Sequence, residues 1–185
     1  MDDKQKIFLL SLARKTIKEY LYKKKEYNID EHSLDELFLE KRGVFVTLHK
    51  NNNLRGCIGY ILPYKPLYIS VIENAYNSAF EDPRFSVLSK KEFEEIDIEI
   101  SVLTVPKKIN SYEDIVIGKH GIFLKNGGFR SVFLPQVAPE NNWDLETTLI
   151  NLSMKASGDP DLWKNINTKF EVFEAEIFSE KKYEN

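Results

Sequence analysis

Residues 43–60 read GVFVTLHKNNNLRGCIGY, and this stretch decides the fold. Two runs rich in β-branched and aromatic side chains, residues 43–48 and 54–60, are separated by the sequence KNNN at residues 50–53. Asparagine tolerates the left-handed backbone that a tight turn needs. The stretch therefore predicts an antiparallel β-hairpin.

The segments on either side of this hairpin have the apolar spacing of helices. Residues 4–25 and residues 68–80 place apolar side chains at i, i+3 and i+4 intervals. The second of these segments runs into Asp82 and Pro83, which stop a helix. A further short helix is expected over residues 34–39.

The second half of the chain adds strands, another hairpin and a third long helix. Ser89 and Glu92 have the spacing of a capping box, and residues 96–102 then alternate apolar and polar side chains as a half-buried strand does. The remaining predicted elements are a hairpin over residues 122–134 that turns at Gly127 and Gly128, a helix from Asp144 to Gly158, and a last strand over residues 173–177.

This order of elements predicts the α+β class, with a mainly antiparallel sheet flanked by helices. The 185 residues fit one domain, or one domain with a larger and a smaller lobe. No internal repeat or low-complexity linker divides residues 1–185.

Composition and charge exclude several classes of protein. The formal net charge of -3 argues against a broad nucleic-acid-binding face, and RNA binding would need Lys, Arg and aromatic side chains clustered on one surface. The N-terminus lacks the pattern of a signal peptide, and no apolar run approaches the roughly 20 residues of a membrane span. Cys57 is the only cysteine, which excludes an intramolecular disulfide. We therefore expect a cytoplasmic protein.

The run LRGCIG at residues 54–59 is the sharpest chemical feature. Glycine inside a strand is costly and usually marks a bulge or the close approach of a ligand or another backbone. In a regular strand Arg55 and Cys57 share a face, where a guanidinium favours a thiolate or holds an anionic substrate. The alternative is that Cys57 packs as a small apolar side chain.

The register of the hairpin decides between these two interpretations. A four-residue loop pairs Arg55 with Leu48 and Cys57 with Val46, which gives an apolar environment and an inert thiol. A loop that differs by one residue places His49 opposite Arg55 and Thr47 opposite Cys57, which gives a polar face. We favour an accessible thiol, because the glycines on both sides of Cys57 leave space above it.

Other polar residues are weaker candidates. Asp82 and Arg84 could pair within the turn that follows the helix, and His120 could carry a proton or fill a turn. Glu140 and Trp143 could line a pocket or form a helix-entry turn. No recognised ligand spacing supports a metal site, and the glycine loops that bind phosphates or dinucleotides are absent from the sequence, so the common cofactor-binding folds are not expected and the cofactor is unknown.

Several ordered motifs resemble the AMME chromosomal-region candidate family: LRGCIG at residues 54–59, ENA at 73–75, AFEDPRF at 79–85, ISVLT at 100–104, IGKHG at 117–121, and FLPQVA at 133–138 with Trp143. The resemblance implies a two-lobed α+β domain. It also implies association with a dioxygenase-like Memo-type protein and a radical-SAM protein, the grouping called AmmeMemoRadiSam.

Two functional hypotheses follow. The first is an enzyme or enzyme component with a cleft at residues 54–59, in which Cys57, Arg55 and His120 are catalytic and the binding residues are Gly56, Gly59, Asp82, Arg84, Glu140 and Trp143. The second is a non-catalytic module that binds a protein partner, in which the glycines only hold backbones together.

Overall fold

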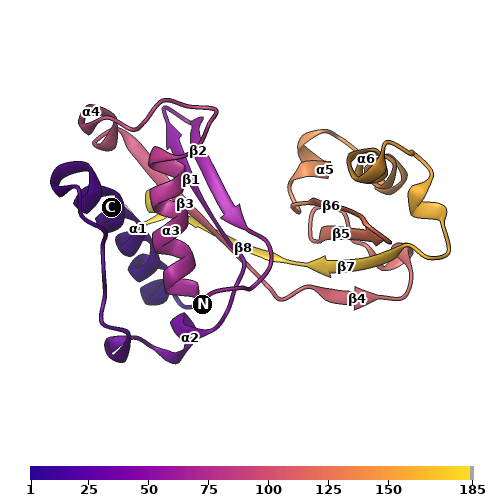
Figure 1. Cartoon of the computed structure of the whole chain (residues 1–185), viewed down its shortest axis with the longest axis horizontal. Coiled ribbons are helices and arrows are strands. Elements are labelled where there is room, and N and C mark those ends of the chain that lie inside the picture. Colours follow the sequence, from indigo (N-terminus) through magenta and orange to yellow (C-terminus); the bar gives the residue numbers. More distant parts are fainter. Residues whose placement is uncertain (184–185) are drawn as a thin grey trace. The chain divides into compact units, whose positions relative to one another are not determined.

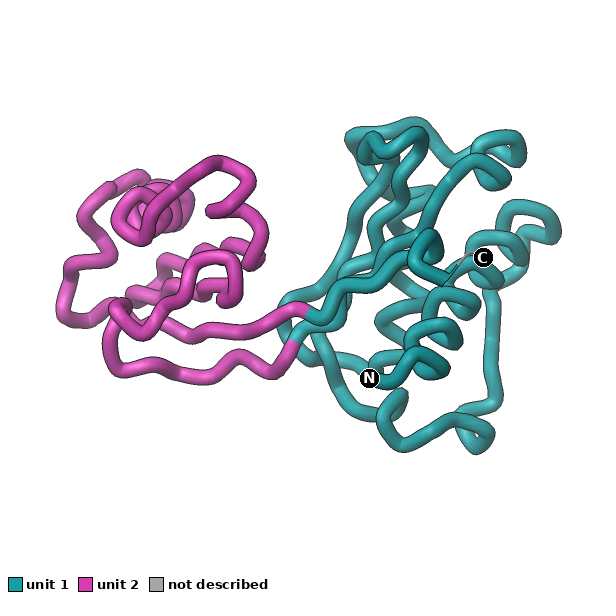
Figure 2. Tube along the Cα trace, turned by 180° about the vertical axis from the view of Figure 1, so that it is seen from behind, with its two compact units in different colours: residues 1–103, 176–185 teal, residues 104–175 magenta. Residues whose placement is uncertain are grey.

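The computed structural model describes residues 1–183, which form two compact units (Figure 2). The first unit contains residues 1–103 and 176–183, and the second contains Thr104–Ala175. Each unit has a four-stranded antiparallel sheet and helices, so the predicted α+β class is confirmed. Within residues 1–183, no helix is both long enough and apolar enough to cross a membrane.

The first unit is built on a sheet with the strand order β2-β1-β3-β8 (Figure 1). The predicted hairpin forms its first two strands. Short 3-10 turns cover Glu31–Ser33 and Glu180–Lys182. The helices and strands are α1 (Asp3–Lys23), α2 (Glu36–Leu39), β1 (Val44–Lys50), β2 (Asn53–Tyr60), α3 (Leu67–Phe80), α4 (Lys90–Phe93), β3 (Ile96–Leu103) and β8 (Ala175–Ser179).

Local capping explains where these helices begin and end. Asp2 and Gln5 form a capping box at the start of α1, and the left-handed backbone of Lys24 ends the helix at Lys23, two residues before the predicted limit. The predicted capping box of Ser89 and Glu92 begins α4. The main helices of this unit therefore lie within a residue or two of the segments that the apolar spacing indicates.

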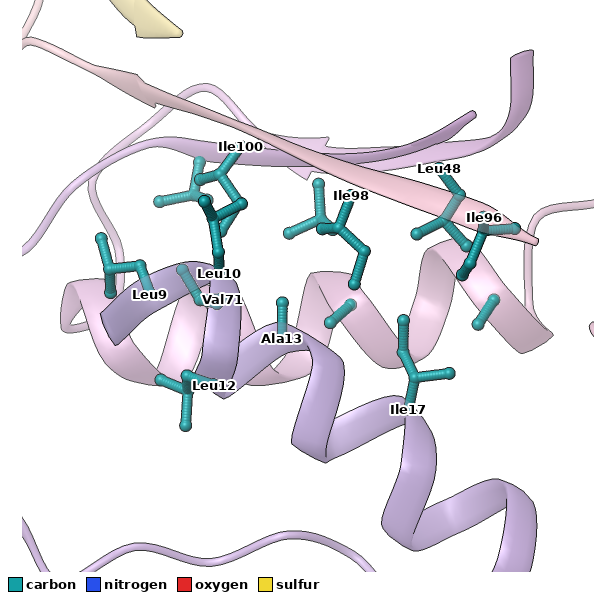
Figure 3. Close-up of a cluster of buried hydrophobic side chains, with 14 of the residues drawn as sticks. Leu9, Leu10, Leu12, Ala13, Ile17, Leu48, Val71, Ile96, Ile98 and Ile100 are labelled. Carbon is teal, nitrogen blue, oxygen red and sulfur yellow. The ribbon is translucent and has the colours of Figure 1, made fainter. Parts of the chain in front are cut away.

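The core of the first unit lies between one face of the sheet and the helices α1 and α3 (Figure 3). Alternate residues of β1 and β3 point into it, because successive side chains of a strand face opposite sides. Helix α1 supplies side chains at helical spacing from the other side of this layer (Figure 3). Fully or almost fully buried members include Leu9, Ala13, Ile17, Val44, Val46, Leu48, Val71, Ala75, Ile98 and Ile100.

The second unit has its own sheet and core. Its strand order is β4-β7-β5-β6, and its core contains Leu124, Leu149, Leu152 and Phe170. Gly127 has a φ of 56° in the predicted turn. The elements are β4 (Lys107–Ile109), a 3-10 turn (Tyr112–Asp114), β5 (Gly121–Asn126), β6 (Phe129–Phe133), α5 (Val137–Glu140), α6 (Leu145–Ser157), a 3-10 turn (Leu162–Lys164) and β7 (Lys169–Phe173).

The prediction of one continuous strand over residues 173–177 is wrong. The chain instead forms two strands, β7 and β8, that belong to different sheets. The break falls at Glu174, whose backbone N–H donates to Thr104 Oγ1 at 2.9 Å and whose carbonyl accepts from the Thr104 N–H at 2.9 Å. Alternation of side chains continues through the break, so the sequence pattern alone does not reveal it.

A close approach between α3 and β2 makes Gly56 essential to the first unit. A Cβ atom at Gly56 would overlap the backbone carbonyl of Ser78 in α3, and the backbone cannot yield as a flexible side chain can. We therefore expect Gly56→Ala to lower the free energy of unfolding by about 3 kcal/mol, measured by chemical denaturation. The control is Gly128→Ala, where an added Cβ meets nothing within 4 Å. Equal stability of the two variants would contradict this packing argument.

Candidate functional site

The hairpin register places Cys57 opposite Thr47 and Gly56 opposite Leu48. The register then shifts, because His49 pairs with Leu54 and leaves Arg55 as an extra residue in a β-bulge. The connecting turn is also shorter than the four residues predicted: only Asn51 and Asn52 separate the strands, with φ of 52° and 63°. Neither predicted register is therefore right along its whole length. The pairing of Thr47 with Cys57, however, is the one that the polar register predicted.

The bulge gives Arg55 a structural partner. Its guanidinium donates to both carboxylate oxygens of Glu92 at 2.9 and 3.2 Å and to the carbonyl of Ser86 at 2.8 Å, and the residue is 8% exposed. The hydrogen bond from Arg55 is the main cause that lowers the pKa of Glu92 to about 2. This ion pair connects β2 to α4, and the sequence-based expectation that Arg55 and Cys57 share a face does not hold because the strand is irregular.

A buried carboxylate fixes the backbone of Cys57. Asp82, whose side chain is 2% exposed, accepts from the Cys57 N–H at 2.9 Å, from the Arg84 N–H at 3.1 Å, and from two guanidinium nitrogens of Arg84 at 2.9 and 2.7 Å. The bond from Arg84 is the largest cause that holds the pKa of Asp82 well below its usual range. Arg84 also donates to the Cys57 carbonyl at 2.9 Å. Both backbone groups of Cys57 are thus held by one ion pair.

The thiol itself has polar neighbours. Thr47 Oγ1 donates a hydrogen bond to Cys57 Sγ at 3.3 Å, and Cys57 is partly exposed. The guanidinium of Arg84 has a raised pKa, first because of its hydrogen bond to Asp82 and in smaller part because of the charge and hydrogen bonding of the Cys57 side chain. A hydroxyl donor therefore contacts the sulfur, and the guanidinium of Arg84 is bonded to the carbonyl of the same residue.

Two titratable side chains border this pair on the same face of the sheet. Thr47 pairs with Cys57 on one side and with Glu99 of β3 on the other, and His49 follows two positions along β1. His49 Nε2 is 3.9 Å from Glu99 Oε1. The polar register predicted from the sequence contains Thr47 and His49 but not Glu99, because only the pairing of β1 with β3 brings Glu99 to this face.

The two glycines of the motif have packing roles. Gly56 lies against the carbonyl of Ser78, and a Cβ at Gly59 would overlap the ring of Phe45. These contacts fill the positions that were predicted to stay open around the thiol, so the partial exposure of Cys57 does not arise from the glycines.

The other predicted site residues lie in the second unit. His120 Nδ1 accepts a hydrogen bond from the Val116 N–H at 3.1 Å, and this bond closes a turn before β5. Trp143 packs on Phe133 with ring centroids 5.8 Å apart, and Glu140 is an exposed residue at the end of α5. Each of the three residues has a place in the local structure of that unit. The first unit brings together Cys57, Asp82 and Arg84.

In the described part of the chain, no three side chains of the His, Cys, Asp or Glu type are grouped so that they could hold a metal ion.

Comparisons with known proteins agree on one family. The AMMECR1 family model matches residues 10–178. A protein from Methanothermobacter thermautotrophicus is 41% identical over 178 residues, which cover 93% of this chain and 92% of that protein. Protein MK0488 from Methanopyrus kandleri is 43% identical over 186 residues, with 96% and 89% covered. The crystal structure of the uncharacterized protein PH0010 from Pyrococcus horikoshii is similar with a TM-score of 0.85 and 38% identity, over 97% of this chain and 93% of that one.

The bonds made by Asp82 predict that its charge stabilises the first unit. Asp82→Asn keeps the shape of the side chain but removes the charge that binds Arg84 and the Cys57 N–H. We expect a loss of about 2–3 kcal/mol in the free energy of unfolding, measured by urea denaturation at neutral pH. Asp161→Asn is the control, because its ion pair with Lys164 is largely exposed and should contribute less than about 0.5 kcal/mol. Equal losses in both variants would refute a special role for Asp82.

The depressed pKa of Glu92 predicts a pH-dependent contribution to stability. A carboxyl group whose pKa falls from 4.5 to about 2 on folding stabilises the folded state fully above pH 4.5, and this stabilisation is lost as the pH falls through 4.5 towards 2. The free energy of unfolding of the wild type, measured by chemical denaturation, should therefore exceed that of Glu92→Gln by roughly 2–3 kcal/mol at pH 7. The difference should be much smaller near the lower limit of that pH window. The exposed Glu113→Gln should change little at either pH. A difference in the free energy of unfolding between wild type and Glu92→Gln that does not change with pH would contradict the stabilising role of this ion pair.

Proposed function

The chain belongs to the AMMECR1 family, and we propose that it acts as an enzyme or enzyme component whose reactive group is the thiol of Cys57. One observation carries this proposal. Cys57 is a partly exposed residue, its sulfur accepts a hydrogen bond from Thr47, and the ion pair of Asp82 and Arg84 holds both its backbone N–H and its carbonyl.

A fixed backbone supports chemistry at the attached side chain, because a nucleophile works best when its position needs no rearrangement before reaction. Cationic and hydroxyl neighbours lower the free energy of a thiolate, which is the reactive form of cysteine. Arg84 and Thr47 have these roles in the proposal. His49 and Glu99, which border Thr47 on the same sheet face, are its candidates for accepting or returning a proton.

The substrate class follows from the same groups. The Arg84 side chain is 54% exposed although it is bonded to Asp82 and to the Cys57 carbonyl. An exposed guanidinium beside a thiol suits a small molecule that carries a carboxylate or phosphate next to an electrophilic carbon. In this proposal the anionic group binds Arg84, and the thiolate adds to a carbonyl carbon while the C=O π electrons move to the oxygen, which then takes a proton.

A second candidate, a module that binds a protein partner, is favoured by the packing of the motif. Gly56, Gly59, Asp82 and Arg84 all have structural roles that need no substrate. The Memo-type and radical-SAM partners that the family resemblance implies stay a proposal, as does a cytoplasmic location. On this view the residues of LRGCIG shape one edge of the first unit, and Cys57 is a packing residue.

The rate of thiol alkylation measured against pH separates the two candidates. Iodoacetamide labelling of the native protein, followed by mass spectrometry, reports on Cys57 alone because the sequence has one cysteine. The enzyme proposal predicts labelling of the folded protein with an apparent pKa below the free-cysteine value of roughly 8.5. Thr47→Val, which removes the hydroxyl donor, should move that apparent pKa upwards, whereas Thr168→Val, at a partly buried position of the second unit, should not.

The opposite result is equally definite. An apparent pKa at or above roughly 8.5, or no labelling until the protein unfolds, would eliminate the nucleophile and leave the binding module. Circular dichroism of each variant would establish that a change in labelling does not come from a loss of the fold.

A further inference from the structure

A concave site lies on the first unit, and Cys57 is not among the residues that line it. Its volume is about 640 Å³, within the range of small-molecule sites. Its most unusual feature is a set of five tyrosines from separate parts of the chain: Tyr20 of α1, Tyr27 of the following segment, Tyr60 at the end of β2, and Tyr68 and Tyr76 of α3. Few structural needs require so many phenol rings around one cavity.

Carboxylates stand behind two of these rings. The hydroxyl of Tyr68 donates to Glu31 at 3.2 Å, and the hydroxyl of Tyr76 donates to Glu81 at 3.3 Å. A phenol that donates a hydrogen bond to a carboxylate has a ring richer in electrons, and the face of an aromatic ring is already its negative region. These two rings are therefore well suited to contact with positive charge.

The structure contains an example of that contact at the same cluster. The ammonium of Lys24 lies over the ring of Tyr20, 4.9 Å from the centroid. Tyr20 in turn packs edge to face with Tyr76, with centroids 4.6 Å apart. A cation is thus already attracted to one ring of the set.

The charges around the cavity also favour a cation. Lys65 binds Glu73 at 2.6 and 2.8 Å, so these two charges neutralise each other. Lys25 and Glu26 are the other charged lining residues and are of opposite sign. The carboxylates of Glu31 and Glu81 add two negative charges at the hydroxyls of the rings, and Lys24 adds one positive charge. The net charge of these three groups is therefore negative.

We propose that this tyrosine-lined cavity binds a small organic cation, of the alkylated ammonium class. The ring faces and the carboxylates behind them attract the charge, because cation–π attraction strengthens where water is partly excluded. The apolar side chains of Ile69 and Ile72, which also line the cavity, contact the alkyl groups of the ligand. This site is independent of the proposed role of Cys57.

The test compares choline with its uncharged isostere 3,3-dimethylbutan-1-ol, using isothermal titration calorimetry on the whole chain. The two probes have nearly the same shape, so a difference in affinity measures the charge. We expect choline to bind about tenfold more tightly. Equal affinity, or no binding of choline at millimolar concentration, would overturn the proposal.

Variants of the rings locate the binding. Tyr27→Leu, in the segment after α1, should weaken choline binding severalfold, and Tyr76→Leu should do so by about tenfold, while Tyr76→Phe keeps the ring and most of the affinity. Tyr112→Leu in the second unit is the matched control. Unchanged affinity in both Tyr27→Leu and Tyr76→Leu would overturn the assignment. Cys57→Ser should bind choline as wild type does, so failure of the thiol proposal is distinguishable from failure of this one.

Discussion

The hydrogen bond from the Cys57 N–H to the buried carboxylate of Asp82 ties the edge strand β2 to the segment that leaves α3. An edge strand presents N–H and C=O groups that can pair with another chain. Asp82 and Arg84 occupy both groups of Cys57, so no further strand can add at this position. Burying a carboxylate is costly, and the four hydrogen bonds that Asp82 accepts offset that cost.

A second set of polar contacts brings α3 close to the sheet along its length. Asn74 donates to the carbonyl of Val44 at 3.1 Å, and the Ser78 hydroxyl donates to the carbonyl of Val46 at 2.6 Å and accepts from the Ile58 N–H at 2.9 Å. Small polar residues can make such bonds only where the helix approaches the strands closely. This approach in turn explains why β2 has glycine at position 56.

The comparison of sequence and structure divides along physical lines. Helices and hairpins were predictable, because apolar spacing and turn residues act over a few positions. The glycines of LRGCIG indicated a β-bulge as one alternative, but its position at Arg55 was not predictable, because the partner of Arg55, Glu92, is distant in the sequence. The same holds for the cavity, whose tyrosines come from separate segments and share no spacing. Sequence motifs indicated Cys57, Asp82 and Arg84, whereas the neighbours Thr47 and Glu99 are determined by the register of the strands.

The two candidate sites share one strand but differ in how their walls are built. Cys57 lies within β2 and is held on both sides by the ion pair of Asp82 and Arg84, whereas part of the cavity wall is formed by residues 25–29, which have no regular secondary structure. Tyr60, three residues beyond Cys57, is the residue of β2 that lines the cavity. A ligand could influence the thiol along this strand only by displacing a backbone that buried hydrogen bonds resist. The two proposed sites are therefore expected to act independently, because an ion pair holds the backbone of Cys57, whereas an irregular segment lines part of the cavity.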